Sequence, residues 1–110
     1  MARGDKSALP GGTAMLVLAL LKTREMYGYE IIEELEKRSD QVFQMKEGTL
    51  YPVLHSLEKE KLVTARDQEA PSGRKRRYYR VTAAGLQALE AKKEEWQVYA
   101  RAVTAILANA

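Results

Sequence analysis

The side chains best placed to do chemistry in this sequence are cations gathered in one short segment. Residues 73–80 read GRKRRYYR, with five basic side chains and no acidic one. Residues 30–38 (EIIEELEKR) are net acidic, so the formal net charge of +3 is concentrated rather than spread. A basic segment of this kind suits an anionic partner such as nucleic acid, and the alternative interpretation is a solvated basic loop.

Catalytic and metal chemistry have little to build on. The chain has a single histidine, His55, and no cysteine. No serine, threonine or acid stands beside His55 in a recognisable catalytic pattern, and no glycine-rich phosphate loop is present. Disulfides and zinc–thiolate sites need cysteine. We therefore predict that the chain is not an enzyme and that it uses no metal and no cofactor.

Length and hydropathy indicate one intracellular domain. A chain of 110 residues is one domain by size. No apolar run approaches the ~20 residues that a membrane span needs. The first residues, MARGDKSALPGG, lack the apolar segment of a secretory signal. We therefore expect a cytoplasmic protein without a membrane partner.

Hydrophobic periodicity predicts three helices in the first half of the chain. Residues 1–12 are interpreted as a flexible N-terminal arm, after which Thr13 caps a helix that is apolar nearly all round. A second, amphipathic helix is predicted from Tyr29 onward. The third lies in GTLYPVLHSLEKEKL, residues 48–62, and is predicted to end near Lys61.

Pro52 lies inside this third helix, where a proline in the interior costs about 3 kcal/mol. In the first turn it gives up little, because the first four N–H groups of a helix have no internal partner. A helix beginning at Gly48 or Thr49 therefore tolerates Pro52, whereas one beginning at Lys46 loses a hydrogen bond to the Gly48 carbonyl. Both alternatives put free N–H groups and a partial positive charge near Pro52, which suits a phosphate.

A β-hairpin and a long helix follow. Pro71, Ser72 and Gly73 give a turn signal between two extended arms, and RRYYRVT suits a strand with Tyr79 and Val81 toward the core. Arg74, Lys75 and Arg76 are expected at the tip of the hairpin. Thr82 is predicted to cap a last helix that runs from about Ala83 to Leu107.

Three helices followed by a hairpin is the order of a winged helix-turn-helix. We therefore predict a mainly α fold with a small β-hairpin: a DNA-binding unit at 13–81 and a C-terminal dimerisation helix at 82–110. The polar groups at the start of the third helix become candidates to meet phosphates and bases: Lys46, Thr49, Tyr51 and His55. Tyr51 is as compatible with a packing role, and His55 with a partly exposed position that touches nothing.

The last helix has heptad-like spacing that a small core cannot cover. Leu89, Trp96 and Val103 are seven apart, as are Tyr99 and Ile106. We therefore predict a homodimer whose two third helices meet half-sites about 34 Å apart on DNA. The predicted interface residues are Leu16, Leu89, Trp96, Val103, Ile106 and Leu107. Trp96 packs in that interface or, alternatively, forms a wall of an effector pocket with Tyr99.

Three stretches, YGYEIIEELEK, GTLYPVLHSLEKEKLV and GRKRRYYRVTAAGLQAL, together resemble the PadR family of bacterial transcriptional regulators. The resemblance implies a winged helix, a homodimer built by the C-terminal helix, and usually repression. It places Gly48, Thr49, Tyr51 and Pro52 at the start of the recognition helix. It places Gly73, Arg74 and Arg76 in the wing. It matches Trp96 to a tryptophan that lines a pocket for flat aromatic compounds in some members.

One residue departs from the family pattern, because Lys61 stands where the family usually has glycine. Either the third helix ends differently here, or Lys61 is strained at a cost of about 1 kcal/mol.

Together these observations predict a repressor that binds a pseudo-palindromic operator and is released by a small hydrophobic or phenolic effector. The alternative is a winged-helix protein-interaction module without sequence-specific DNA binding.

Overall fold

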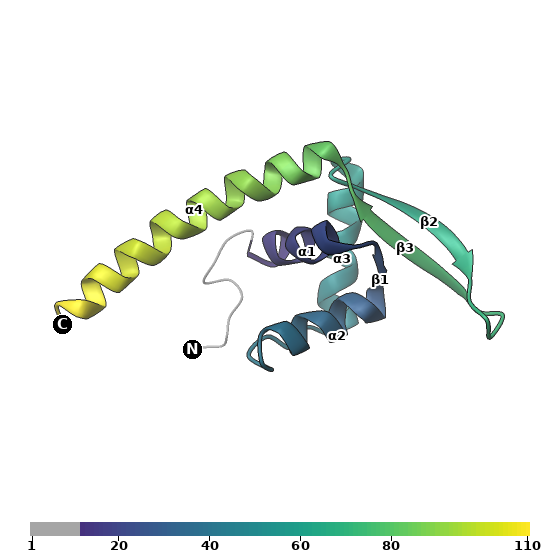
Figure 1. Ribbon diagram of the computed structural model, residues 1–110, viewed down its shortest axis with the longest axis horizontal. Helices are drawn as coiled ribbons and strands as arrows, with labels where there is room; N and C mark the ends of the chain where they lie inside the picture. Colours follow the sequence, from purple (N-terminus) through teal and green to yellow (C-terminus); the bar gives the residue numbers. More distant parts are fainter. Residues whose placement is uncertain (1–11) are drawn as a thin grey trace.

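Four helices and a three-stranded sheet make up the computed structural model, which describes residues 12–110 (Figure 1). The elements are α1 (Gly12–Thr23), β1 (Met26–Tyr27), α2 (Gly28–Arg38), α3 (Glu47–Lys59), β2 (Val63–Glu69), β3 (Lys75–Val81) and α4 (Ala83–Ala108). This is the predicted order with one short strand added, and the winged helix is confirmed. Thr13 is not the cap of α1, because the helix begins at Gly12. The rest of the predicted arm lies outside the described residues.

The core forms where α1 packs against all the other helices and β3. Because α1 is enclosed in this way, it is apolar on more than one side: Met15, Val17, Leu18, Leu20 and Leu21 are all buried. The other helices each contribute one apolar face. Ile31 and Leu35 come from α2, and Leu50, Leu54 and Leu57 from α3. This core fixes the orientation of α3.

The sheet has the strand order β1-β3-β2, with both pairings antiparallel. Tyr79 faces the core and is buried, with Val81 packed beside it, as predicted. The strand β1 was not predicted, because it is two residues long and is recognisable only by its pairing, Met26 opposite Tyr79. The hairpin is therefore anchored to the body along one edge.

The junction between α2 and α3 depends on a glycine. The helix α2 begins at Gly28, one residue before the predicted start, and Glu30 Oε1 accepts a hydrogen bond from Tyr27 N at 3.1 Å. A Cβ atom at Gly28 would overlap the Tyr51 hydroxyl and lie 2.8 Å from Tyr51 Cζ. Only glycine therefore lets the two helices pack this closely.

The end of α3 decides between the two alternatives for Lys61. The helix ends at Lys59, and Lys61 adopts a left-handed conformation with φ of 65°. Leu62 N donates to Leu57 O at 2.9 Å and Lys61 N donates to Glu58 O at 3.0 Å. These are the two hydrogen bonds of the glycine-type helix ending. The ending is kept, and Lys61 is strained within it by about 1 kcal/mol.

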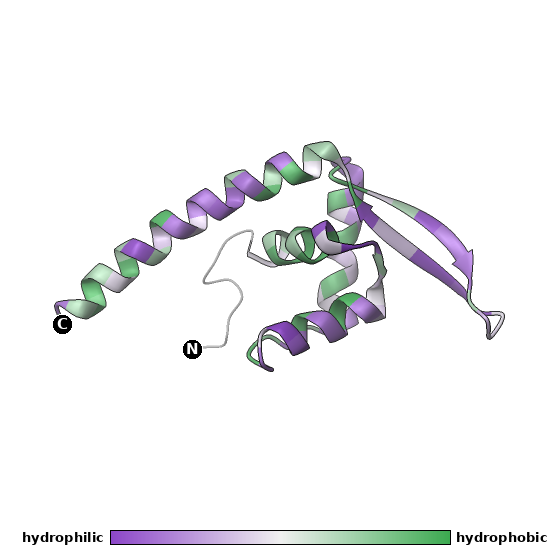
Figure 2. Cartoon of the chain, in the orientation of Figure 1, coloured by the Kyte–Doolittle hydropathy of each residue, from purple (hydrophilic) through white to green (hydrophobic). Residues whose placement is uncertain are grey.

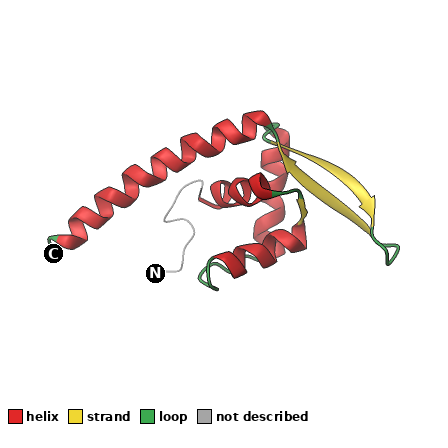
Figure 3. Ribbon diagram, in the orientation of Figure 1, coloured by secondary structure: helices red, strands yellow, loops and turns green. Residues whose placement is uncertain are grey.

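The helix α4 starts as predicted, because Gly85 N donates to Thr82 Oγ1 at 3.0 Å. Its first turns pack on α1, and the remainder extends away from the body, opposite to the wing (Figure 3). Apolar residues continue to its end (Figure 2). Leu89, predicted to lie in a dimer interface, is instead only 2% exposed and belongs to the core of its own chain.

Candidate nucleic-acid interface

The start of α3 is open to solvent. The helix begins at Glu47, with the extended residue Lys46 before it, and Lys46 O accepts hydrogen bonds from Thr49 N and Leu50 N at 3.0 Å. Lys46, Gly48, Pro52 and His55 are exposed, and Thr49 is half-buried. Lys46 and Gly48 lie next to the positive end of the helix dipole, whereas His55 lies two turns further along the helix.

Pro52 lies in the second turn of α3, beyond the first turn in which a proline costs little. The helix starts at Glu47, so the missing Pro52 N–H would have met the Gly48 carbonyl. Gly48 is exposed, and water can therefore satisfy that carbonyl. The structure is thus nearer to the second of the two alternatives, with one helical hydrogen bond lost.

Tyr51 takes the packing role that was one of its two interpretations. The ring is half-buried against Gly28, and burial together with the nearby Glu47 carboxylate raises the pKa of its phenol. The Tyr51 and His55 ring centroids are 6.4 Å apart. His55 stays exposed, so Tyr51 acts as a support beside it.

The wing tip carries cations with nothing to neutralise them. Gly73, with φ of 88°, turns the chain, and Ala70 O accepts from Gly73 N at 2.8 Å. Arg74 follows the turn and Lys75, the first residue of β3, flanks the tip as predicted, whereas Arg76 lies further into the strand. Within residues 12–110, the side chains of Arg74 and Lys75 make no hydrogen bond or ion pair. Their charge is available to a phosphate.

The face of the wing that turns toward α3 is neutralised instead. Arg77 Nη2 lies 2.8 Å from Glu58 Oε2, and Arg77 Nη1 lies 3.3 Å from Asp67 Oδ1. Glu58 belongs to α3, so the pair ties the wing to that helix. Of the predicted basic cluster, Arg77 therefore has a structural role.

The opposite, outer face of the sheet holds contacts that sequence reasoning missed. Arg66 on β2 binds Glu25 in the loop before β1, with Nη2–Oε1 and Nε–Oε2 distances of 2.5 and 3.1 Å. The Arg76 guanidinium lies 4.4 Å from the centre of the Tyr27 ring. The alternation of side chains along a strand places Arg76 on this face. Its partner, Tyr27, could be found only by recognising that β1 is a strand.

Comparison with known proteins agrees with this architecture. The family described as "Transcriptional regulator PadR-like family" matches residues 17–91. The chain belongs to the PadR-like family. A transcriptional regulator of Mycobacterium tuberculosis is 37% identical over 79 residues, which is 72% of this chain and 70% of that protein.

Two solved structures extend the likeness to nearly the whole chain. A transcriptional regulator from Clostridium thermocellum has a TM-score of 0.82 at 29% identity, covering 90% of this chain and 96% of that one. A PadR-like transcriptional regulator from Bacillus cereus has a TM-score of 0.77 at 32% identity, covering 93% and 97%. This PadR-like protein is therefore a transcriptional regulator and not an enzyme, as predicted.

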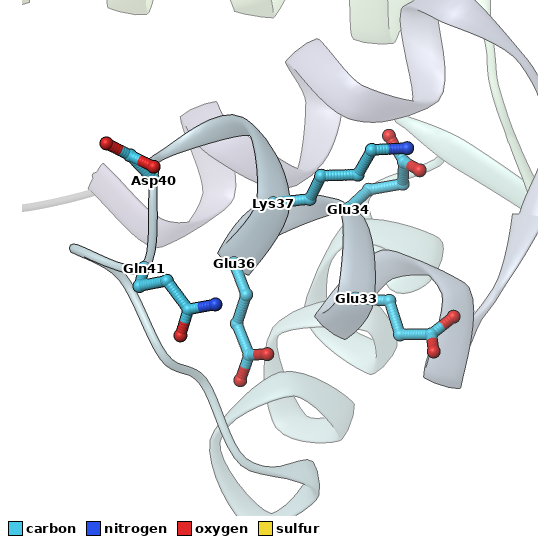
Figure 4. A pocket seen from close by; sticks show the side chains of 6 residues that line it. All are labelled: Glu33, Glu34, Glu36, Lys37, Asp40 and Gln41. Carbon is cyan, nitrogen blue, oxygen red and sulfur yellow. The ribbon is translucent and has the colours of Figure 1, made fainter.

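The acidic surface of this PadR-like chain lies on α2, away from the wing. A hollow there is lined by Glu33, Glu34, Glu36, Lys37, Asp40 and Gln41 (Figure 4). The lining is net acidic although Glu34 is already paired with Arg38 at 2.8 Å, so this hollow suits a phosphate less well than the wing does. Between residues 12 and 110, no cluster of His, Asp and Glu could hold a metal ion.

The residues predicted for the dimer interface and for an effector pocket differ in how exposed they are. Leu16 is half-buried on the core, and Leu89 is inside it. Trp96, Val103, Ile106 and Leu107 are exposed on the distal part of α4. The Trp96 and Tyr99 rings lie together, with centroids 5.8 Å apart and planes at 34°. None of the described helices is long and apolar enough to cross a membrane.

Proposed function

We propose that this PadR-like regulator is a repressor that binds a pseudo-palindromic operator as a homodimer in the bacterial cytoplasm. The observation that carries the proposal is that one fold presents two open surfaces that suit DNA. One is the start of α3, where exposed Lys46 and Glu47 flank the free N–H groups and His55 lies two turns further along the helix. The other is the wing tip with the cations Arg74 and Lys75. A helix start fits the major groove, and a cationic tip fits the neighbouring phosphates or minor groove.

Each part of this interface has a proposed task. Thr49 and His55 face the bases, while Lys46, Gly48 and Pro52 bring the backbone of the helix start close to a phosphate. Arg74 and Lys75 neutralise phosphates beside the wing. Tyr51 supports the helix start through its contact with Gly28.

The homodimer is supported by the distal half of α4. Ile106 and Leu107 are 71% and 68% exposed, and Trp96 and Val103 lie along the same helix. Water-exposed apolar residues at heptad-like spacing indicate a helix that pairs with a second copy. Two-fold pairing gives two recognition helices and explains a pseudo-palindromic operator.

Release by a small hydrophobic or phenolic compound is the last part of the proposal. The adjacent Trp96 and Tyr99 rings offer an aromatic surface on the proposed dimer helix. A flat ligand stacked there would alter how the two helices pair, and with it the spacing of the recognition helices. Quenching of the fluorescence of Trp96, the single tryptophan, measures whether the ligand stacks there.

The experiment that tests the function is sequencing of genomic DNA recovered with the purified full chain. The proposal predicts enrichment of a few fragments that share an inverted repeat with half-site centres about one DNA turn apart. Recovery of DNA without any shared sequence would overturn it. That outcome, with retained dimerisation, would favour a winged-helix protein-interaction module.

A further inference from the structure

An ion pair on the outer face of the sheet bridges the wing and the body. Glu25 lies in the loop before β1, and Arg66 lies in the middle of β2. Because the strand order is β1-β3-β2, this pair spans the whole width of β3. Both Glu25 oxygens accept from the guanidinium, at 2.5 and 3.1 Å. A two-point contact of this kind fixes direction as well as distance.

A stack of rings and guanidinium groups fills the surface next to this pair. The Arg66 guanidinium lies 5.2 Å from the centre of the Tyr78 ring on β3. The Tyr78 ring meets Tyr27 on β1 edge to face, with centroids 5.4 Å apart and planes at 70°. The Arg76 guanidinium lies over the Tyr27 ring, 4.4 Å from the ring centre. All three strands are thereby joined on one face.

The same stack leads to the recognition helix. Tyr27 is the residue immediately before α2, and the next residue, Gly28, is in contact with the Tyr51 ring on α3. Tyr51 in turn lies beside His55, with ring centroids 6.4 Å apart. The wing and α3 are therefore connected through four contacts and the peptide bond between Tyr27 and Gly28.

We propose that Arg66, anchored by Glu25, is a positioning residue that holds the wing at the angle the recognition helix requires. This inference rests on the proposed DNA-binding function. A two-stranded hairpin is marginal by itself, so its angle depends on what ties it to the body. The strands are about 20 Å long, and a tilt of about 10° moves the tip by about 4 Å. In a released wing the tip samples such displacements before DNA binds, so binding with Arg74 and Lys75 on the same phosphates costs the free energy of ordering the wing again.

The alternative role for Arg66 is a direct phosphate contact, and the two roles predict opposite effects at Glu25. Arg66 already donates to Glu25 and to Gln68. If Arg66 bound phosphate, neutralising Glu25 would free its guanidinium and remove a repelling charge, so DNA would bind more tightly. If Arg66 positions the wing, neutralising Glu25 releases the wing and DNA binds more weakly.

The test measures binding of the full chain to its recovered operator fragment by fluorescence anisotropy at several salt concentrations. We expect Glu25→Gln and Arg66→Gln each to weaken binding about fivefold. The double variant should be no weaker than either single one, because both changes release the same contact. Arg66→Lys should weaken binding similarly although it keeps the charge, because an ammonium cannot form the two-point contact.

Arg80→Gln is the matched control for charge, since Arg80 lies on the same face and its charge, after the hydrogen bond from Arg66, also lowers the pKa of the Glu25 carboxyl, but it makes no hydrogen bond or ion pair within residues 12–110. It removes the same charge as Arg66→Gln, and we expect a change of no more than about twofold. The salt slope should stay unchanged in the Arg66 variants. Arg74→Ala, by contrast, should reduce it by about 0.9, the value for one lost phosphate contact.

Tighter binding by Glu25→Gln, or a salt slope reduced by Arg66→Gln, would overturn the positioning role. Hydrogen exchange supplies a readout that is independent of DNA. Arg66→Gln should speed exchange of the β1–β3 amides and leave the α1 amides unchanged, and unchanged exchange in both would also overturn the role. If the wild-type chain binds no operator, the proposed function fails, and hydrogen exchange still decides whether Arg66 holds the wing.

Discussion

Leu89 and Leu107 are the same residue on the same face of the same helix, five turns apart, yet their surroundings differ completely. Leu89 is 2% exposed because α1 and the sheet cover the first turns of α4. Leu107 is 68% exposed because nothing among residues 12–110 reaches the end of the helix. One apolar stripe therefore runs from a complete core to an uncovered surface.

This difference separates two tasks within one chain. The body has a complete core whose apolar residues are covered, although Tyr29, Val42 and Phe43 lie exposed outside that core. Arg77 and Arg66 join the wing to this body. The distal part of α4 is incomplete, since residues 12–110 leave Ile106 and Leu107 largely uncovered and Trp96 and Val103 partly so. A substitution in the body should therefore change folding, and a substitution in the distal part should change association.

The largest effect is expected for Leu89→Ala. Removing a buried leucine side chain costs about 3 kcal/mol in the free energy of unfolding, through lost burial and the cavity left behind. The matched change Leu107→Ala should alter the free energy of monomer unfolding by less than about 0.5 kcal/mol. Chemical denaturation across a range of protein concentrations compares them. Equal losses of unfolding free energy in the two variants would contradict the separation of a folding body from an associating distal helix.

The next largest effect concerns association. In the double variant Ile106→Arg and Leu107→Arg, two charges would have to be buried between paired helices, and unpaired buried charge is costly. We expect operator affinity to fall about a hundredfold, since a monomer meets only one half-site. Light scattering should show a monomer with an unchanged circular dichroism spectrum. Val98→Arg, on the opposite side of α4, is the control and should remain dimeric.

Much of this architecture could be predicted because it depends on neighbouring residues. The order of elements follows from apolar periodicity, and Thr82 caps α4 because the hydroxyl needs only the next turn. Tyr79 points inward by simple strand alternation. Lys61 could be singled out because a helix ending of this type requires a left-handed residue.

The remainder depends on contacts between distant segments. Met26 and Tyr27 form a strand only because β3 lies beside them. Arg76 was therefore predicted at the hairpin tip, whereas its guanidinium lies over the Tyr27 ring. The 41-residue separation of Glu25 and Arg66 hides their pairing in the same way. Heptad spacing grouped Leu89 with Trp96 and Val103, because periodicity reports that a face is apolar and not which chain covers it.

A smaller effect, of opposite sign, is expected at the end of α3. Lys61→Gly removes the steric cost of a left-handed residue, so the free energy of unfolding should increase by about 1 kcal/mol. The change lies in the body and should leave the dimer dissociation constant unaltered. Thermal denaturation and light scattering measure the two quantities. Loss of stability would show that the Lys61 side chain makes a contact worth more than the strain.

The smallest effect is expected for Tyr79→Phe. The Tyr79 hydroxyl is buried without a well-formed hydrogen bond among residues 12–110. Burial raises the pKa of its phenol, and the nearby Arg77 guanidinium partly offsets this. Removing an unsatisfied buried hydroxyl should be neutral or stabilise the fold by about 0.5 kcal/mol. A loss of more than about 1 kcal/mol in chemical denaturation would reveal a partner for this hydroxyl, such as an ordered water.

The most direct test of the central claim is the salt dependence of operator binding by the wild-type chain and Arg74→Ala. Phosphate contacts release counterions, so the logarithm of the association constant should fall linearly with the logarithm of salt concentration. The account predicts a steep wild-type slope that is shallower by about 0.9 in Arg74→Ala. Wild-type binding that does not depend on salt concentration, or the same salt slope in both proteins, would contradict phosphate contacts by the wing.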